Sequence, residues 1–226
     1  MGLSHSPSIV MDGLVLALDA GNVKSYPGSG TTWNDLSGRG NTGTLTNGPT
    51  YNSANGGSLV FDGVDDFVNF NFANPFSETV IVWVKSATSI WNSSGFISSS
   101  RRQNGHIIHP DGATSGVGFY IANSSGTLTY MGGVTPSNIT VPQMYAYTTN
   151  GSNVHKGYLN GVEVVSSTTS ITRTTTPSSQ PWLVGKDDTL NRHLNGNIYN
   201  VMRYNRALTA AEVQQNFNAL RGRFSI

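Results

Sequence analysis

The sequence predicts an all-β protein, an antiparallel β-sandwich that carries one short C-terminal helix. Only 11% of its 226 residues are charged, while glycine, with 26 copies, and Ser, Thr and Asn are abundant. Such a composition suits many short strands joined by turns and disfavours a helical bundle. Short apolar runs recur between these turn-rich stretches, and the strongest helix-start signal comes late, at Thr209. We therefore expect a sandwich that ends in a helix.

The first half of the chain contains the apolar runs from which we predict the first strands. Residues 1–11 are expected to form an irregular arm, because Pro7 and its Ser-rich flanks favour extended or turn conformations. A loop with short strand pieces is expected at residues 21–48. The run at 79–84 is apolar on both faces, as in a strand at the centre of a sandwich. Strands are predicted at residues 14–19, 58–62, 67–72 and 79–84.

The second half continues the same pattern at spacings typical of antiparallel sheets. Asn160-Gly161 is the strongest hairpin signal, because both residues tolerate the positive φ of a tight two-residue turn. Trp33, Trp83 and Trp182 lie in or beside strand patterns and are expected in the core. Strands are predicted at residues 96–100, 118–122, 127–131, 144–149, 154–160, 162–166, 182–185 and 198–204.

The C-terminal helix is predicted from its first turn. Thr209 and Glu212 have the spacing of a capping box, in which each side chain accepts a hydrogen bond from the other residue's backbone N–H. Leu208 and Val213 are placed for a hydrophobic staple around that cap. Val213 and Phe217 then begin one apolar stripe.

Composition and charge exclude several classes of protein. We expect one domain over residues 12–226, because no internal repeat or linker is visible. The sequence has no cysteine, which excludes disulfides and thiolate metal sites. Its net charge of +1 gives no electrostatic footprint for nucleic acid. No apolar run approaches a membrane span, and the N-terminus has no secretory signal, so we expect synthesis in a host cytoplasm without membrane insertion.

Four segments in order carry a family resemblance. They read SLVFDGVDDFV, TVIVWVK, GYLNGVEV, and WLVGK followed by LNGNIYNVMRYNRALTAAEV, at residues 58–68, 79–85, 157–164, 182–186 and 194–213. Together they resemble the laminin-G-like branch of the concanavalin-A-like lectin/glucanase superfamily, over roughly residues 12–221. The opening from residue 12 to residue 48 is also similar to the leaders of tail, fibre and other virion-associated proteins of tailed bacteriophages.

The resemblance implies a fold and a setting. The fold would be two antiparallel sheets packed face to face as a concanavalin-A-like jelly roll, and the setting a virion, as a capsid decoration or a tail or fibre component. Other virion proteins and cell-surface polysaccharides would be its partners, with a homo-oligomer as a further expectation. Arg203 departs from the family pattern, which favours an aliphatic residue there, so its strand is expected to be more exposed.

Carboxylates are the first candidates for catalytic groups. Glycoside hydrolysis normally needs two carboxylates about 5–10 Å apart. The chain has three glutamates, Glu78, Glu163 and Glu212, which lie far apart in the sequence. No acidic pair alternates along a predicted strand, and Glu212 is explained as a helix cap. We therefore expect a protein that is not an enzyme.

Metal sites have one main candidate. Asp62, Asp65 and Asp66 cluster around a tight turn, and Ca²⁺ prefers such hard oxygen ligands. The alternative is that these side chains accept hydrogen bonds from backbone N–H groups in the turn. No other cofactor is implied. His106 and His109 could share one face of a strand or loop, but two histidines are too few ligands to indicate Zn²⁺.

A sugar-binding patch is the third candidate. Trp91 lies in a polar, turn-rich segment and is expected to be an exposed aromatic platform, and Arg101, Arg102 and Gln103 form a polar loop nearby in sequence. The alternative is that Trp91 fills one end of the sandwich and the arginines are solvated.

The sequence thus favours a non-enzymatic phage virion protein whose lectin-like domain binds cell-surface glycans. A carbohydrate-active enzyme or its accessory carbohydrate-binding module is the alternative. A structural spacer without a ligand also stays open, because folds of this kind host many functions.

Overall fold

The computed structural model describes residues 7–70, 75–91, 97–98, 105–110, 115–173, 182–187 and 190–226. Short strands account for most of the regular structure. They are β1 (Leu14–Asp19), β2 (Thr32–Trp33), β3 (Gly43–Thr46), β4 (Thr50–Asn52), β5 (Ser58–Asp62), β6 (Phe67–Phe70), β7 (Glu78–Ser86), β8 (Ile97–Ser98), β9 (His106–Pro110), β10 (Val117–Ala122), β11 (Leu128–Val134), β12 (Gln143–Thr149), β13 (His155–Leu159), β14 (Val162–Ser167), β15 (Trp182–Val184) and β16 (Asn195–Tyr204). The helices are η1 (Ala54–Gly56), α1 (Ala210–Leu220) and η2 (Arg221–Phe224).

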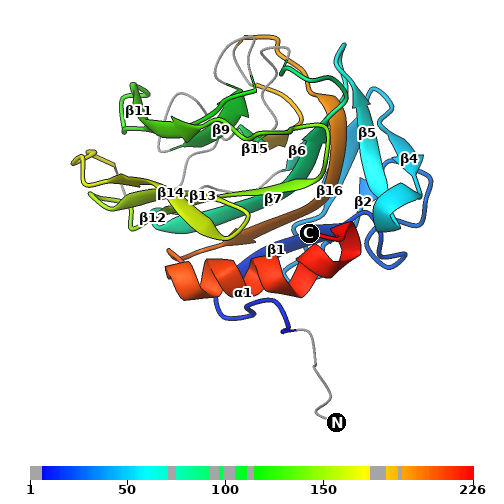
Figure 1. Ribbon diagram of the computed structural model, residues 1–226, viewed down its shortest axis with the longest axis horizontal. Coiled ribbons are helices and arrows are strands. Elements are labelled where there is room, and N and C mark those ends of the chain that lie inside the picture. Colours follow the sequence, from blue (N-terminus) through cyan, green and yellow to red (C-terminus); the bar gives the residue numbers. More distant parts are fainter. Residues whose placement is uncertain are drawn as a thin grey trace.

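Within the described part of the chain, two eight-stranded antiparallel sheets face each other (Figure 1). Sheet A has the order β14-β13-β12-β7-β16-β5-β4, and β1 pairs with β16 beyond the end of β5. Sheet B has the order β11-β10-β9-β8-β15-β6-β3-β2. The predicted concanavalin-A-like sandwich is therefore confirmed.

Alternation along β7 divides the apolar residues into two cores. Val80, Val82 and Val84 point between the sheets, whereas Ile81 and Trp83 point to the outer face of sheet A. There Trp83 stacks on Phe217 of α1, with 5.6 Å between ring centroids and 5° between ring planes. Helix α1 lies across this outer face in Figure 1. One face of sheet A is thus covered by the helix, and the other by sheet B.

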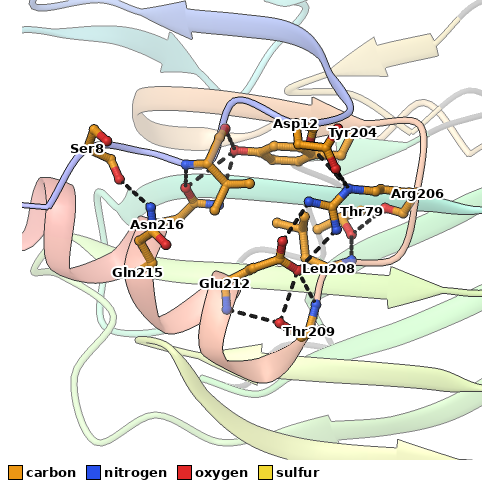
Figure 2. A network of polar contacts seen from close by, with 11 residues as sticks. Ser8, Asp12, Thr79, Tyr204, Arg206, Leu208, Thr209, Glu212, Gln215 and Asn216 are labelled. Carbon is orange, nitrogen blue, oxygen red and sulfur yellow. Dashed lines mark hydrogen bonds and ion pairs between the residues drawn. The ribbon is translucent and has the colours of Figure 1, made fainter.

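The start of α1 has the predicted cap. Thr209 donates its backbone N–H to Glu212 Oε2 at 2.8 Å, and Glu212 returns its own N–H to Thr209 Oγ1 at 3.3 Å (Figure 2). Leu208 and Val213 are both buried in the core under the helix, as the staple requires. The capping box therefore fixes where the helix begins, and the staple fixes how it docks.

The N-terminal segment is attached to this helix. Asn216 accepts a hydrogen bond from the backbone N–H of Val10 at 2.8 Å, and the hydroxyl of Tyr204 donates to the carbonyl of Val10 at 3.0 Å. Gln215 donates to the carbonyl of Ser8 at 2.8 Å (Figure 2). Residues 8–10 have no regular secondary structure, and these bonds hold them against the domain.

Most of the predicted strands are present at the predicted places. The hairpin at Asn160-Gly161 is confirmed, with φ of 50° and 81° joining β13 to β14. Trp33, Trp83 and Trp182 are fully buried, also as predicted. Strand β9 was not predicted as a strand, because its five residues, HIIHP, combine two histidines with a proline. No helix among the described residues has the length and apolarity needed to cross a membrane.

Candidate functional site

The acidic turn between β5 and β6 brings three carboxylates together. Oxygen atoms of Asp62, Asp65 and Asp66 all lie within 4.8 Å of one another, as the sequence suggested. Asp62 and Asp65 are exposed, and Asp66 is buried. Burial raises the pKa of the Asp66 carboxyl, and the negative charges of Asp62 and Asp65 add to that rise. The turn is therefore a local concentration of negative charge at the rim of the sandwich.

Two of these carboxylates accept hydrogen bonds from backbone N–H groups within the turn. Asp62 Oδ1 accepts the backbone N–H of Val64 at 2.8 Å and that of Asp65 at 3.4 Å. Asp66 Oδ2 accepts the N–H of Asp62 at 3.1 Å. The four carboxylate oxygens that accept none of these bonds are fewer than the roughly six to eight ligands that Ca²⁺ takes. The hydrogen bonds explain the aspartates without an ion, and the donor set alone is incomplete for calcium.

The predicted sugar platform at Trp91 is not exposed. Trp91 has 1% of its surface accessible and belongs to the core between the sheets. Its apolar indole ring is better accommodated there than in water, despite the polar residues around it in sequence. The alternative, in which Trp91 fills the sandwich, is confirmed. Arg101, Arg102 and Gln103 lie outside the described residues.

Arg203 belongs to a buried cluster of charged side chains and does not lie on an exposed strand. Arg203 and Glu78 both have side chains with 0% exposure, and they form an ion pair at 2.7 Å. The Nδ1 of His106 lies 2.9 Å from Glu78 Oε1, and the Nη2 of Arg173 lies 3.7 Å from the same oxygen. The expectation of an exposed strand at Arg203 is therefore wrong. The guanidinium group is tolerated between the sheets because Glu78 compensates its charge.

Charge compensation also determines how these groups titrate. Burial acts to raise the pKa of the Glu78 carboxyl, but His106, Arg203 and Arg173 outweigh burial and hold that pKa well below its usual range. Burial lowers the pKa of the His106 imidazole, although Glu78 opposes the change. At neutral pH His106 is thus a neutral donor to an ionised Glu78. A signal for this cluster existed in the sequence, since Arg203 lies within an apolar strand and Glu78 comes directly before one.

His106 and His109 do not share a face. Residues three apart on a strand point to opposite sides. His106 points between the sheets toward Glu78, whereas the His109 ring stacks on Tyr120, with 4.9 Å between ring centroids. The two histidines therefore cannot act together as ligands of one metal ion.

The other two glutamates are also engaged in structural contacts. Glu163 pairs with Lys156 across β13 and β14, at 2.8 Å. Glu212 accepts hydrogen bonds from Arg206 at 3.0 and 2.6 Å (Figure 2), and those bonds lower the pKa of its carboxyl to about 2. A carboxyl with so low a pKa is ionised at neutral pH and cannot act as a general acid. Glu212 is a helix cap, as the sequence indicated.

Comparisons with known structures agree on the fold. Domain 4 of a GH43 extracellular arabinanase from Geobacillus stearothermophilus, solved in complex with arabinotriose, is 17% identical with a TM-score of 0.69. That match covers 90% of this chain and 97% of the arabinanase domain. The binding domain of botulinum neurotoxin DC, solved in complex with SialylT, is 13% identical with a TM-score of 0.70.

The toxin match covers 93% of this chain but 52% of the toxin chain, so this chain spans about half of that binding domain. A Trypanosoma rangeli sialidase in complex with sialic acid is 15% identical, with a TM-score of 0.65, and the match covers 97% of this chain and 36% of the sialidase. At these identities the likeness concerns the fold alone. A comparison with curated protein sequences found no match.

The sequence itself matches a family profile. Residues 53–214, well over half of the chain, match the laminin-G-like family described as "Concanavalin A-like lectin/glucanases superfamily". The matched region runs from just before β5 into α1 and so includes most of both sheets. The chain therefore belongs to this family of concanavalin-A-like lectin/glucanase domains.

Proposed function

We propose that this chain is a non-enzymatic carbohydrate-binding module of a phage virion, displayed as a capsid decoration or a tail or fibre component. The observation that carries the non-enzymatic part is the placement of its glutamates. Glu78 is sealed between the sheets, Glu163 pairs with Lys156, and Glu212 caps α1. A retaining or inverting glycosidase needs two carboxylates that reach one glycosidic bond. Glu78 cannot reach a polymer, and the other two glutamates are paired with cations. In the acidic turn, Asp62 and Asp66 accept backbone hydrogen bonds of the turn itself, which supports a structural role for these carboxylates.

Carbohydrate binding is supported by the fold and by related structures. The family description names lectins, and two of the similar structures were solved in complex with arabinotriose or with SialylT. The virion setting is supported by the likeness of residues 12–48 to phage tail and fibre leaders. Fold alone assigns no ligand, so the binding must be measured.

The test has two arms. Purified protein is applied to a panel of soluble polysaccharides by affinity electrophoresis, and the same mixtures are assayed for reducing ends. Retarded migration without new reducing ends is the expected result. Release of reducing ends, or no retardation by any polymer, would contradict the proposal.

The virion arm uses particles of the phage that encodes the chain. Mass spectrometry of purified particles should detect the polypeptide at a fixed ratio to the major capsid protein. Absence of the polypeptide from the particles would contradict the virion part of the proposal but not the carbohydrate-binding part. The second candidate, an accessory module of a carbohydrate-active enzyme, is favoured by the 97% coverage of the arabinanase domain. A chain found joined to a catalytic domain would establish that alternative.

A further inference from the structure

A row of aromatic rings crosses the outer face of sheet B at its β11 edge. The rings of His109 and Tyr120 are nearly parallel, with 11° between their planes and 4.9 Å between their centroids. The Tyr130 ring follows at 5.0 Å from that of Tyr120, tilted by 49°. Tyr120 and Tyr130 are directly opposite in the pairing of β10 with β11. The row therefore spans three adjacent strands.

Two glycines make room for these rings. Gly118 pairs with His109 on one side and with Gly133 on the other, so all three occupy one line across the sheet. A Cβ on Gly118 would lie 2.7 Å from Cε2 of Tyr120 and 3.1 Å from Cε2 of Tyr130. A Cβ on Gly133 would lie 2.6 Å from the Tyr130 hydroxyl. Neither glycine has a positive φ, so no left-handed backbone conformation requires them. The rings fill the space beside both glycines, and at Gly133 the Val117 carbonyl oxygen, 2.8 Å from an added Cβ, also leaves no room for a side chain.

The row is accessible at one end. Tyr130 is 50% exposed, Tyr120 is half-buried and His109 is 6% exposed. On the opposite face of the same strands, Ile108, Phe119 and the other core residues pack between the sheets. Helix α1 covers the outer face of sheet A, on the far side of the molecule from β9 and β11 (Figure 1). Tyr130, which lies on the edge strand β11, is thus the part of the row that a ligand can reach.

The three strands that carry the aromatic row have no acidic, lysine or arginine side chains. Strands β9, β10 and β11 read HIIHP, VGFYIA and LTYMGGV, with no Asp, Glu, Lys or Arg. Tyrosine combines an apolar ring with a hydroxyl that donates and accepts hydrogen bonds. Such a surface matches a neutral ligand that has both C–H faces and hydroxyl groups. An anionic ligand would find no cation on these strands.

We infer that Tyr120 and Tyr130 form the floor of a binding site for a neutral oligosaccharide. One sugar ring packs on the exposed part of Tyr130, and the phenol groups hydrogen-bond its hydroxyls. His109 supports Tyr120 from the buried side and keeps its ring in place. This inference rests on the proposed function, and it adds where on the domain the ligand binds and which class of glycan binds.

The experiment compares substitutions in the row with a matched tyrosine elsewhere. Tyr51, on β4 of sheet A, is 39% exposed and serves as the control. Arabinan, mannan and mixed-linkage β-glucan are the neutral probes, and polygalacturonate is the charged probe. Affinity electrophoresis gives the dissociation constant for each variant, and thermal unfolding confirms that each variant is folded.

Tyr130→Ala is expected to weaken binding of a neutral probe by at least about tenfold, the loss typical of a truncated aromatic anchor. Tyr130→Phe keeps the ring and should lose less. Gly118→Ala should weaken binding without removing an aromatic group, because the added methyl displaces both rings. Tyr51→Ala should bind like the wild type.

Four outcomes would overturn the inference. Neutral binding that survives Tyr130→Ala and Tyr120→Ala places the site elsewhere, while the proposed function stands. Binding of polygalacturonate alone assigns a charged ligand instead. A dimer in sedimentation that Tyr130→Ala converts to a monomer shows that a second copy occupies the face. A wild type that binds no polymer removes the proposed function as well, which separates the two failures.

Discussion

Arg203 and Glu78 meet between the two sheets, where the guanidinium Nε and Nη2 lie 3.1 and 2.7 Å from Glu78 Oε2. The two residues are 125 positions apart in sequence and lie on the paired strands β16 and β7. The Arg203 guanidinium also lies 5.0 Å from the centre of the Trp182 ring on sheet B. This contact ties the charged pair to the opposite sheet.

Removing one partner of this pair should be costly. Arg203→Met leaves the buried Glu78 carboxylate with Arg173 at 3.7 Å and the neutral His106. Loss of one partner of a buried ion pair costs about 3–5 kcal/mol, because the other charge stays desolvated. The free energy of unfolding from urea titrations should fall by that amount.

Arg206→Met is the matched control for this variant. Arg206 pairs with Glu212 and Asp12, and its side chain is 29% exposed. Exposed pairs are worth about 1 kcal/mol or less. Equal losses in the two variants would show that burial does not set the strength of the Arg203 pair.

The stability of the fold should fall as the pH drops below neutral. Burial lowers the pKa values of His106, His155 and His193 below the ordinary value of 6.5. As the pH falls through 6.5, the unfolded chain takes up protons that the folded protein does not, so the free energy of unfolding decreases. Below about pH 4.5, Glu78 adds a second loss, because its pKa is depressed in the folded state.

Urea midpoints measured between pH 4 and pH 8 check this expectation. His155→Gln removes one of the three groups and should flatten the profile between pH 7.5 and pH 5.5, even if it lowers stability at neutral pH. A wild-type profile that is flat in this window would contradict the assignment of neutral, buried histidines.

Loss of the helix cap should lower stability by less than loss of the buried ion pair. Thr209→Ala removes the acceptor for the Glu212 N–H and should cost about 1 kcal/mol, as other N-cap replacements do. Thr209→Ser keeps the hydroxyl and should retain most of that stability. Thermal unfolding of the two variants separates the contribution of the capping hydroxyl to stability from that of side-chain packing. If serine were as harmful as alanine, the hydroxyl would not be the source of the effect.

The acidic turn should hold its shape without an ion. Asp62→Ala removes the acceptor of two backbone N–H groups and should lower stability by about 1 kcal/mol. Asp65→Asn should be nearly neutral, and millimolar CaCl₂ should leave the melting temperature of the wild type unchanged. A calcium-dependent rise that Asp65→Asn abolishes would instead identify the turn as a metal site.

The sequence by itself determined the elements of this protein whose causes are local. The hairpin at Asn160-Gly161 and the cap at Thr209 depend on residues within a few positions of one another. Their φ preferences and short-range hydrogen bonds are readable without a fold. The alternating apolar runs predicted most strands for the same reason.

Only the tertiary structure decided which distant residues meet. Glu78 and Arg203 are compatible as buried residues because sheet register brings them together, whereas either charge alone would be uncompensated between the sheets. Trp91 is buried in a turn-rich segment because the core accommodates its ring. The Tyr120–Tyr130 row likewise depends on the pairing of β10 with β11 and on glycines across both strands. Register is a property of the assembled sheet, so local patterns could not predict these contacts.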